Sequence, residues 1–500
     1  MSVSAVTIDA FQGGLDLVSS LNAIQQGSCP SAMNMRIAEY GGVEKILGYS
    51  SFATLSEAGS DMFEYKKRDG TYDRLIVSSA TKVHSIDSTG VVSEINTGRT
   101  SEERTSFASY DDVLYFLGPQ NVLKSWDGAT LTSHATGANT GPNKGVILGV
   151  WQNRMFVAKA TSGVLGTRIE WSEPGILTGV GSWPAANFVE LGGPGSTERI
   201  IGAVVTPDGL IVFTTASTYL LFNSSTGANR VLDPEFGCES HRSLSYIDGM
   251  TMGVCRDGVF AVQGAQPLSI VSRKVDPLFI VEDPDTSTAA GVRWRNSYLM
   301  SYDRGSTFLT LDIVPSLGMP VMANEYPAFC WQAMDFSGPD LYFVDRNDRT
   351  QVRLAFSSGS FGSAPIRAHY ELPAQALSTD EQLSRLRRVR VLGRGIVSVG
   401  ARSNYDGFDS HSGTAAMPST GGTGLFDTSL WDAATWVGYT LGEAFATIPC
   451  RGRRIGLRIE EFSSNVMPSR DHLGFSVGPD IGAAAIYQIE MQFNTLARRR

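Results

Sequence analysis

Arginine is the residue type whose spacing in this chain most clearly indicates an interaction. Arg385, Arg387, Arg388 and Arg390 lie in one segment that alternates arginine with apolar residues, as a strand does. Such a cluster can contact a nucleic-acid backbone or pair with acidic groups of a neighbouring subunit. We favour the second interpretation because no aromatic residues interleave with the arginines to stack bases. The four arginines are therefore a candidate interface.

The chain carries no pattern that indicates catalysis or metal binding. Its six histidines are isolated, and none falls in an HxxxH or HExxH spacing. No GxSxG elbow occurs, and the glycine-rich segment 192–196 lacks the Lys-Ser/Thr pair of a phosphate loop. The five cysteines are scattered without a CxxC pair, which argues against a disulfide framework or a zinc site. We expect no catalytic residue, no metal and no cofactor, and predict that the protein is not an enzyme.

One short motif is more specific. Residues 301–308 read Ser-Tyr-Asp-Arg-Gly-Ser-Thr-Phe and fit the Asp-box pattern S-x-D-x-G-x-T-W/F. The motif resembles the turn of sialidase-like propellers, where the aspartate caps the turn through backbone N–H groups and the aromatic ring packs between strands. We expect these roles of Asp303 and Phe308. A sialidase would also need an arginine triad, a tyrosine nucleophile and usually several boxes, so a sialidase-like glycoside hydrolase is the least favoured alternative.

Composition favours an all-β protein. Of 500 residues, 42% are hydrophobic and only 18% are charged, which argues against disorder and long solvated helices. The 53 glycines and 21 prolines favour many short strands joined by turns, and the length suggests two or three folding units. The net charge of −9 argues against binding of phosphate by the chain as a whole. Residues 1–365 carry the negative charge, because 366–500 holds a slight excess of arginine over acids.

A weak repeat runs from about residue 64 to residue 360. Each copy has an apolar or aromatic residue, a turn containing Asp, Asn or Gly, and an alternating apolar strand. The copies begin at Lys67, Tyr110, Trp151, Thr206, Tyr246, Trp294 and Phe336. Their spacing of roughly 40 to 55 residues suits four short strands, which is one β-propeller blade. We predict a β-propeller of about seven blades over 51–365, with six or eight also compatible; a pair of β-sandwiches is the alternative.

The regions on either side of the repeat have a different residue pattern. Residues 1–50 have little periodicity but carry apolar residues such as Phe11 and Leu15, so we predict an extended N-terminal arm whose Phe11 and Leu15 contact a neighbouring chain. Residues 372–386 form the best helical window, with Ser378 as N-cap and Glu381 three residues later. Alternating strands follow, and we predict that 366–500 is a β-sandwich-like domain.

The N-terminal sequence resembles that of a known protein family. It reads Phe-Gln-Gly-Gly-Leu over 11–15, Gly-Ser-Cys-Pro-Ser-Ala-Met-Asn over 27–34 and Gly-Gly-Val-Glu-Lys-Ile-Leu-Gly over 41–48. This is similar to the opening of the tail nozzle or hub proteins of short-tailed bacteriophages, also called packaged-DNA stabilisation proteins. The Asp-Gly turn in 403–408 resembles the β-domain that follows the propeller in that family. In 45–48 two apolar residues separate Lys45 from Gly48, a wider spacing than the family pattern.

The resemblance implies a structural virion protein, made in the host cytoplasm and located in the viral tail. It implies a homo-hexameric ring below the portal and its adaptor that extends the DNA channel and helps retain and release the genome. Double-stranded DNA would pass through the channel without specific binding, and the acidic propeller region would repel its phosphates. No membrane-spanning segment is expected. The alternative from a different class is a receptor- or glycan-binding β-propeller at a tail tip.

Overall fold

The structure is a computed structural model and consists almost entirely of β-strands. It describes residues 4–20, 23–38, 41–70, 72–102, 104–134, 145–158, 166–175, 178, 182–192, 196–304, 307–334, 336, 340–376, 384–394, 396–403, 412–416, 442–452, 454–462 and 485–495. Two compact units divide the chain. Unit 1 contains Met1–Tyr49, Pro320–Glu325 and Phe356–Arg500, and unit 2 contains Ser50–Met319 and Tyr326–Ala355. The expectation of an all-β protein is confirmed.

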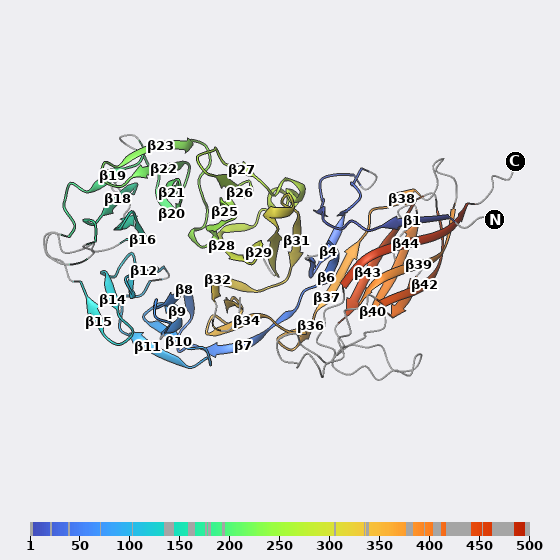
Figure 1. The fold of residues 1–500 in the computed structure, drawn as a ribbon, viewed down its shortest axis with the longest axis horizontal. Coiled ribbons are helices and arrows are strands. Elements are labelled where there is room, and N and C mark those ends of the chain that lie inside the picture. The colour runs from blue at the N-terminus through green and yellow to red at the C-terminus, as the bar shows by residue number, and fades with distance from the viewer. Residues whose placement is uncertain are drawn as a thin grey trace, which may run out of the picture. The chain divides into compact units, whose positions relative to one another are not determined.

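Unit 2 is built from consecutive four-stranded antiparallel sheets that follow one another around a common centre (Figure 1). The first three sheets contain β8 (Gly59–Lys66), β9 (Asp73–Ser79), β10 (Val83–Ile86) and β11 (Val92–Asn96), then β12 (Ser106–Tyr110), β13 (Val113–Leu117), β14 (Lys124–Trp126) and β15 (Leu131–Ser133), then β16 (Ile147–Trp151), β17 (Arg154–Ala158), β18 (Arg168–Trp171) and β19 (Phe188–Glu190).

Three further sheets repeat this order. They contain β20 (Ile200–Thr206), β21 (Gly209–Thr214), β22 (Thr218–Asn223) and β23 (Ala228–Asp233), then β24 (Ser245–Ile247), β25 (Met250–Cys255), β26 (Gly258–Gln263) and β27 (Ser269–Ile270), then β28 (Asp285–Trp294), β29 (Ser297–Arg304) and β30 (Thr307–Ile313). The residues of β31 (Val321–Asn324) belong to unit 1. Short helical turns interrupt them at η1 (His241–Ser243), η2 (Arg273–Val275), α1 (Pro277–Ile280) and η3 (Pro315–Leu317).

The seventh sheet joins strands from distant parts of the sequence. Its strands β32 (Ala328–Met334), β33 (Asp340–Asp345) and β34 (Gln351–Ser358) are followed by β7 (Gly48–Thr54), which precedes the first sheet in the chain. The hairpin of β35 (Ser360–Phe361) and β36 (Ala364–Pro365) belongs to unit 1, where Phe361 pairs with Tyr49. The last sheet of unit 2 is therefore completed by β7, which precedes the other strands of this unit in the chain.

The sequence repeat marks the same turn in each of the seven sheets. Every copy falls at the connection between the first two strands of a sheet, as between β12 and β13 or between β16 and β17. Asp111 and Asp112, and likewise Gln152 and Asn153, have positive φ angles of 50° to 61°. Two-residue turns with positive φ at both positions match the twist of a hairpin, and Asp and Asn tolerate that conformation. The sequence repeat therefore marks the hairpin turns between the first two strands of these sheets.

Neighbouring sheets of unit 2 pack face to face through apolar side chains. One cluster joins the third and fourth sheets and includes Trp171 and Leu221. Another joins the fourth and fifth, where the rings of Phe213 and Phe260 lie 5.2 Å apart. The seventh sheet packs on the first through residues such as Val344, which shares a cluster with Leu75 and Val77. The fourth sheet thus buries both of its faces, one against the third sheet and one against the fifth.

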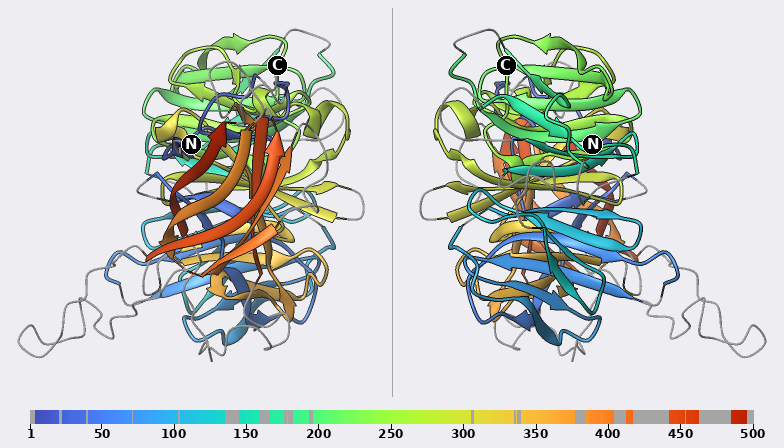
Figure 2. Two further views of the ribbon diagram at one scale, coloured as in Figure 1. Left: turned by 90° about the vertical axis from the view of Figure 1, so that its right-hand side faces the viewer. Right: turned by 90° about the vertical axis from the view of Figure 1, so that its left-hand side faces the viewer.

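Unit 1 contains two larger antiparallel sheets, whose long strands run side by side in the left view of Figure 2. One has the order β42 (Gly442–Gly452), β39 (Ser384–Arg394), β44 (Ala485–Thr495), β6 (Val43–Lys45) and β5 (Met35–Ile37), with β1 (Ser4–Ile8) paired to β44. The other has the order β4 (Ser31–Met33), β37 (Arg367–Glu371), β43 (Arg454–Phe462), β40 (Ile396–Ser403) and β41 (Ser412–Ala416), with β38 (Gln375–Ala376) paired to β43. A parallel pair, β2 (Gly14–Leu15) with β3 (Ser28–Cys29), completes the unit.

The structure corrects the predicted domain boundaries. Residues 1–49 are not a separate arm, because β1, β4, β5 and β6 are strands of the two sheets that the C-terminal residues build. Phe11 and Leu15 are 0% and 3% exposed, and the Phe11 ring meets Tyr370 edge to face at 5.8 Å. The prediction that these two side chains contact a neighbouring chain is wrong, since their own chain already buries them.

The helix predicted over 372–386 is also wrong at both of its ends. Gln375 and Ala376 pair with Ile455 and Arg454, and the strand that begins at Ser384 pairs on both sides, with β42 and β44. Residues 377–383, which include the expected cap, lie outside the described residues. Pairing with two neighbouring strands satisfies the backbone and overrides a weak local helix propensity.

We expect Phe11→Ala to lower the free energy of unfolding by about 3 to 5 kcal/mol, because it removes a fully buried ring. Urea denaturation monitored by circular dichroism measures the change. Val18→Ala is the matched control, since Val18 is 60% exposed and its truncation should cost less than about 0.5 kcal/mol. Equal stability of the two variants would contradict the assignment of the N-terminal segment to the core of unit 1.

Candidate functional site

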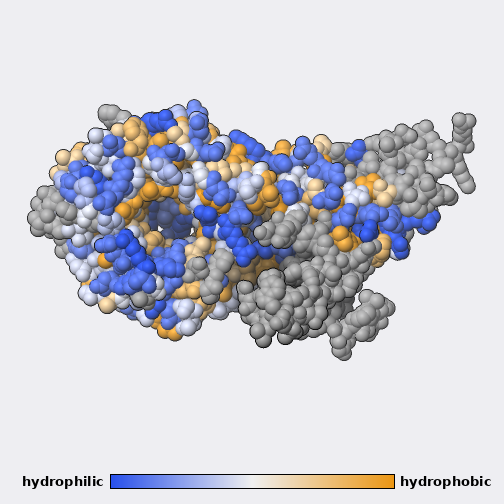
Figure 3. Space-filling model, in the orientation of Figure 1, coloured by the Kyte–Doolittle hydropathy of each residue, from blue (hydrophilic) through white to orange (hydrophobic). Residues whose placement is uncertain are grey.

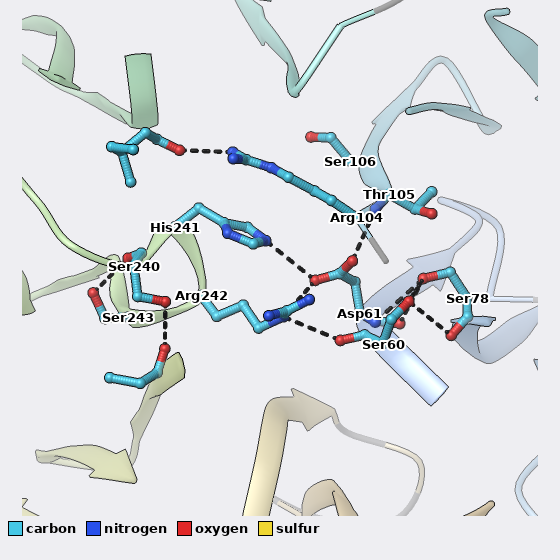
Figure 4. A network of polar contacts seen from close by, with 12 residues as sticks. Ser60, Asp61, Ser78, Arg104, Thr105, Ser106, Ser240, His241, Arg242 and Ser243 are labelled. Atoms are coloured by element: carbon cyan, nitrogen blue, oxygen red, sulfur yellow. Dashed lines mark hydrogen bonds and ion pairs between the residues drawn. The ribbon is translucent and has the colours of Figure 1, made fainter. Parts of the chain in front are cut away.

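Four charged or titratable side chains from separate parts of unit 2 converge on one buried cluster (Figure 4). Asp61 lies on β8, Arg104 lies just before β12, and His241 and Arg242 lie on η1, the turn before β24. We call this group the central cluster. The first, second and fifth sheets of unit 2 each contribute to it, so it joins parts of the chain that the sequence separates widely.

Asp61 is the acceptor at the middle of the central cluster. Its Oδ1 accepts a hydrogen bond from Arg242 Nε at 2.8 Å and lies 3.3 Å from His241 Nε2, while Oδ2 accepts the Thr105 backbone N–H at 2.8 Å. Burial by itself would raise the pKa of this carboxyl. The charge of Arg242 and the hydrogen bonds outweigh burial and hold the pKa well below its usual range. Asp61 is therefore ionised at neutral pH.

The two arginines of the central cluster differ in their partners. Arg242 also donates from Nε to the Ser60 carbonyl at 3.1 Å, and its guanidinium lies 4.8 Å from the centre of the Phe329 ring. Arg104 donates from Nη2 to the Ile201 carbonyl at 2.6 Å, and its buried Nε has no hydrogen-bond partner among the described residues. Burial lowers the pKa of Arg104 to about 10, so it stays charged at neutral pH.

His241 is neutral because of its surroundings. Burial is the largest cause that lowers its pKa, and the charge of Arg104 lowers it further; together they bring it to about 3 in spite of the nearby Asp61 carboxylate. At neutral pH the described members of the cluster therefore comprise one carboxylate, two guanidiniums and a neutral imidazole.

Two more arginines contact an aromatic ring that Arg242 of the central cluster also contacts. The guanidiniums of Arg346 and Arg349 lie 5.7 Å and 3.9 Å from the centre of the Phe329 ring, which Arg242 also contacts. Arg346 donates to the Thr288 carbonyl at 2.8 Å and lies 3.5 Å from an Asp303 carboxylate oxygen. Arg349 donates from Nε to the Gly59 carbonyl at 2.9 Å. The arginines thus tie several sheets together by bonding to their backbones.

The hydroxyl groups beside the cluster are engaged in structural bonds. Ser60 and Ser78 share a hydrogen bond of 2.8 Å, Ser243 donates to the Ser240 carbonyl at 2.7 Å, and Ser240 donates to the Ala289 carbonyl at 2.6 Å. A serine nucleophile needs a base within hydrogen-bond reach, and the described contact of His241 is instead with Asp61. The described hydroxyl groups beside the central cluster therefore take part in hydrogen bonds that hold the fold.

The predicted arginine interface lies on one strand of unit 1. Arg385, Arg387 and Arg388 are exposed on β39, while Leu386, Val389 and Val391 of the same strand are fully buried. A register shift between Leu386 and Arg388 lets two consecutive arginines face outward. Arg390 pairs with Glu490 at 3.1 Å, and Arg388 lies 4.3 Å from the centre of the Phe445 ring. Contact with another chain stays a prediction.

The two ends of the Asp-box contact one arginine. The turn at residues 305–306 lies outside the described residues, so its capping by Asp303 stays a prediction. Asp303 lies 3.5 Å from Arg346, and the Arg346 guanidinium lies 5.5 Å from the centre of the Phe308 ring. Both motif residues therefore contact an arginine that belongs to the Phe329 group.

The five cysteines are buried, and no disulfide joins them. Burial raises the pKa of Cys29, Cys238 and Cys330 to about 12, so these thiols stay protonated. In the part of the chain that the structure describes, no group of three or more His, Cys, Asp or Glu residues is arranged to hold a metal ion. No helix of that part is long and apolar enough to cross a membrane.

A polar groove of about 320 Å³ lies between the first two sheets of unit 2. Tyr72, Arg74, Asp87, Glu94 and Trp126 are among its lining residues. The Arg74 guanidinium lies 4.3 Å from the centre of the Tyr72 ring, and Trp126 is only 6% exposed. Because the aromatic rings are covered or buried, the groove offers little flat surface for stacking a sugar.

No family model and no curated protein matches this chain. Among solved structures, U3-55K is similar at 7% identity and a TM-score of 0.43, with 62% of this chain and 98% of that chain covered. The computationally designed Ika8 protein is similar at 12% identity and a TM-score of 0.37, with 61% of this chain and 99% of that chain covered. Similarity at this level carries no argument about function.

We expect Asp61→Asn to destabilise unit 2 by about 3 kcal/mol, because it removes the carboxylate charge that pairs with the Arg242 guanidinium inside the protein. Urea denaturation checks the value. Asp111→Asn is the matched control, since Asp111 is 76% exposed and its ion pair with Arg68 lies at the surface. A loss no larger than that of the control would show that the central cluster contributes little to stability.

The depressed pKa of His241 predicts a loss of stability on acidification. Between the unfolded pKa of about 6.5 and the folded value of about 3, the unfolded chain binds one more proton, so stability falls as pH decreases. At about 1.4 kcal/mol per pH unit, His241 should account for about 2 kcal/mol between pH 6.5 and pH 5. Comparison of wild type with His241→Gln over this range isolates the effect, and parallel pH profiles would contradict it.

Proposed function

We propose that this chain is a structural, non-enzymatic virion protein that forms a ring-shaped tail nozzle or hub. In this role it extends the DNA channel below the portal and adaptor and helps retain and release the genome. The proposal begins with the N-terminal segments 11–15, 27–34 and 41–48, whose text is similar to that family. It is supported by what those segments do in unit 1.

The observation that carries the proposal is that the family-like segments form the framework of the fold. Phe11 is fully buried, and Asn34, at a φ of 56°, donates from Nδ2 to a Glu325 carboxylate oxygen at 2.8 Å and to the Arg367 carbonyl at 2.9 Å. Asn34 also accepts the Glu325 backbone N–H at 3.0 Å. One buried side chain thus links three distant segments, which is a structural role for a signature residue.

The proposed architecture is a seven-bladed β-propeller with a β-sandwich. In favour of the propeller, the seven sheets of unit 2 succeed one another in sequence order, and the seventh combines β32 to β34 with β7. Sharing the last sheet between the two ends of a propeller closes the ring without an exposed edge. In favour of the sandwich, the two large sheets of unit 1 each bury alternate residues, such as Leu457 and Ile459 on β43.

The proposed DNA channel lies between subunits and does not follow the centre of unit 2. Side chains from the first, second and fifth sheets meet at the central cluster, and a duplex cannot pass where opposing side chains touch. The channel would therefore be enclosed by a homo-hexamer whose acidic surfaces repel the DNA phosphates. The portal, its adaptor and other tail proteins are the proposed partners.

A receptor- or glycan-binding role is the second candidate. The groove at Tyr72 and Trp126 is the observation in its favour. Because Arg74 covers the Tyr72 ring and Trp126 is buried, we rank this role below the nozzle.

Negative-stain microscopy of the purified protein tests the proposal. We expect class averages with six-fold symmetry and an open centre between subunits, and no retardation of a DNA duplex in a gel at low salt. Incubation with the portal and adaptor of the same virus is the control for a chain that assembles only on its partners. A monomer or trimer under both conditions, or tight DNA binding, would overturn the nozzle proposal.

A further inference from the structure

We propose that a short apolar and acidic segment of unit 2 docks on the arginine strand β39 of a second copy of this chain. The segment is 280–283 (Ile-Val-Glu-Asp), which begins at the last residue of α1, and we call it the tip. The receiving face is the exposed side of β39 and β42 around Arg388 and Phe445. The inference rests on the proposed homo-oligomer, because it names the contact that would join its copies.

The first argument is the exposure of the tip. Val281 and Ile280 are 78% and 67% exposed, more than any other large apolar side chain among the described residues. Two adjacent aliphatic side chains in water are stabilised by burial against a partner, and an exposed apolar group of this kind indicates an interaction site.

The second argument is that unit 2 holds the tip in place. Leu278 and Phe279, which precede it, are 7% and 4% exposed, and the Phe279 ring lies 5.5 Å from the Tyr302 ring. The Val281 N–H donates to the Pro277 carbonyl at 3.2 Å. A segment that is already ordered in the free protein loses little conformational entropy on binding.

The third argument is that the tip and the receiving face carry opposite charge. Residues 274–285 contain four carboxylates and one basic residue, Lys274. Glu282 pairs with Arg304 of its own unit, whereas Asp283 is exposed beside the aliphatic pair. The tip therefore presents a carboxylate together with its apolar side chains.

The strands of the receiving face carry an excess of arginine. The sequence places five arginines on β39 and one on β42, against one glutamate on β42 and one on β44. Glu490, the glutamate of β44, already pairs with Arg390. Arg385 and Arg388 are exposed on the same strand. A carboxylate of the tip would thus meet guanidinium groups, with which it forms charge-assisted hydrogen bonds.

An aromatic ring supplies the apolar part of the receiving face. Phe445 is 41% exposed, and the Arg388 guanidinium lies 4.3 Å from the centre of its ring. The buried side chains of the same strands, such as Val389 and Ala446, lie in the core of unit 1. The ring and the arginine beside it match the two components of the tip, an aliphatic pair and a carboxylate.

The contact joins two different surfaces of the chain and is therefore head to tail. The tip belongs to unit 2 and the receiving face to unit 1, so a pair of copies still has one tip and one receiving face unused. A contact of this type repeats until a ring closes. On the side that Figure 3 draws, the described hydrophobic residues lie in separate groups among hydrophilic ones, so we expect contacts between copies to combine apolar and charged residues.

Sedimentation of the full-length protein over a range of concentrations tests the contact with two single variants. Val281→Arg sets a positive charge against Arg388, and Arg388→Glu sets a negative charge against the acidic tip. We expect each variant alone to associate at least tenfold more weakly than wild type. An equal mixture should associate again, because the new arginine of one variant meets the new glutamate of the other and the second contact is the native one. Val91→Arg is the matched control, since Val91 is 59% exposed elsewhere on unit 2.

Several outcomes would overturn the inference. Wild-type protein that stays monomeric at every concentration, single variants that associate as wild type does, or a mixture that stays dissociated would each do so. Recovery in the double variant without recovery in the mixture would place the contact within one chain. Circular dichroism checks folding, and Ile280→Asn and Phe445→Ser repeat the test if a variant does not fold.

Microscopy of the same samples separates this contact from the tail function. Variants that keep a six-fold ring would contradict the contact and leave the nozzle proposal intact. Variants that form the ring but no longer join the portal and adaptor would assign the face to those partners and overturn the inference. A wild type that associates through this contact into an open filament would support the contact and overturn the nozzle.

Discussion

Pairing between strands from opposite ends of the sequence is the constraint on which both units depend. In unit 1, β1 pairs with β44 along five residues, from Ser4 with Phe493 to Ile8 with Ile489. In the seventh sheet, β7 lies beside β34, about 300 residues further along the chain. An unpaired strand edge invites association with other chains, and these pairings remove it. The entropy lost on closing a loop grows only slowly with the length of the loop. Strands that are far apart in the sequence can therefore pair once many strands form together.

The same constraint explains why the N-terminal segment is rich in apolar residues but poor in periodicity. Its strands are short and belong to two different sheets, β4 in one and β1, β5 and β6 in the other. A segment that crosses between sheets cannot keep one alternation pattern, because each short strand faces a different neighbour. Phe11, between β1 and β2, packs on Tyr370. An interface and a core strand of this kind have the same apolar composition, so composition alone cannot distinguish them.

The part of the fold that could be predicted is the part that local chemistry decides. Hairpin turns such as Asp111-Asp112 need positive φ angles, which restricts the residue types that can form them. The turns and the strands beside them can therefore be recognised in the sequence. The composite sheets of unit 1 could not be predicted, because no local pattern states which distant strand will be the neighbour. Leu386 illustrates this: its spacing suits a helix, yet pairing on both sides makes it part of β39.

The central cluster shows the same limit for a site. Asp61, Arg104 and Arg242 have no mutual spacing that any motif describes, and they meet only because the sheets that carry them surround one centre. A buried carboxylate with two cations is costly to assemble and is strongly destabilised if one partner is lost. The cluster therefore favours one arrangement of the sheets over others, although apolar packing between sheets supplies most of the burial. The arginines of the two units also differ in their surroundings: Arg104 and Arg349 donate to backbone carbonyls inside unit 2, whereas Arg385, Arg387 and Arg388 of β39 are exposed.

That difference bears on how the chain would meet its neighbours. On β39, Arg390 already pairs with Glu490 and Arg388 stacks on Phe445, which is itself 41% exposed. An arginine held over an exposed ring presents a flat, partly apolar surface rather than an isolated charge. Such a surface suits a protein partner with matching acidic and apolar groups better than a phosphate backbone, which offers charge without an apolar complement. The exposed face of β39 thus supports the interpretation of this arginine strand as a contact between proteins.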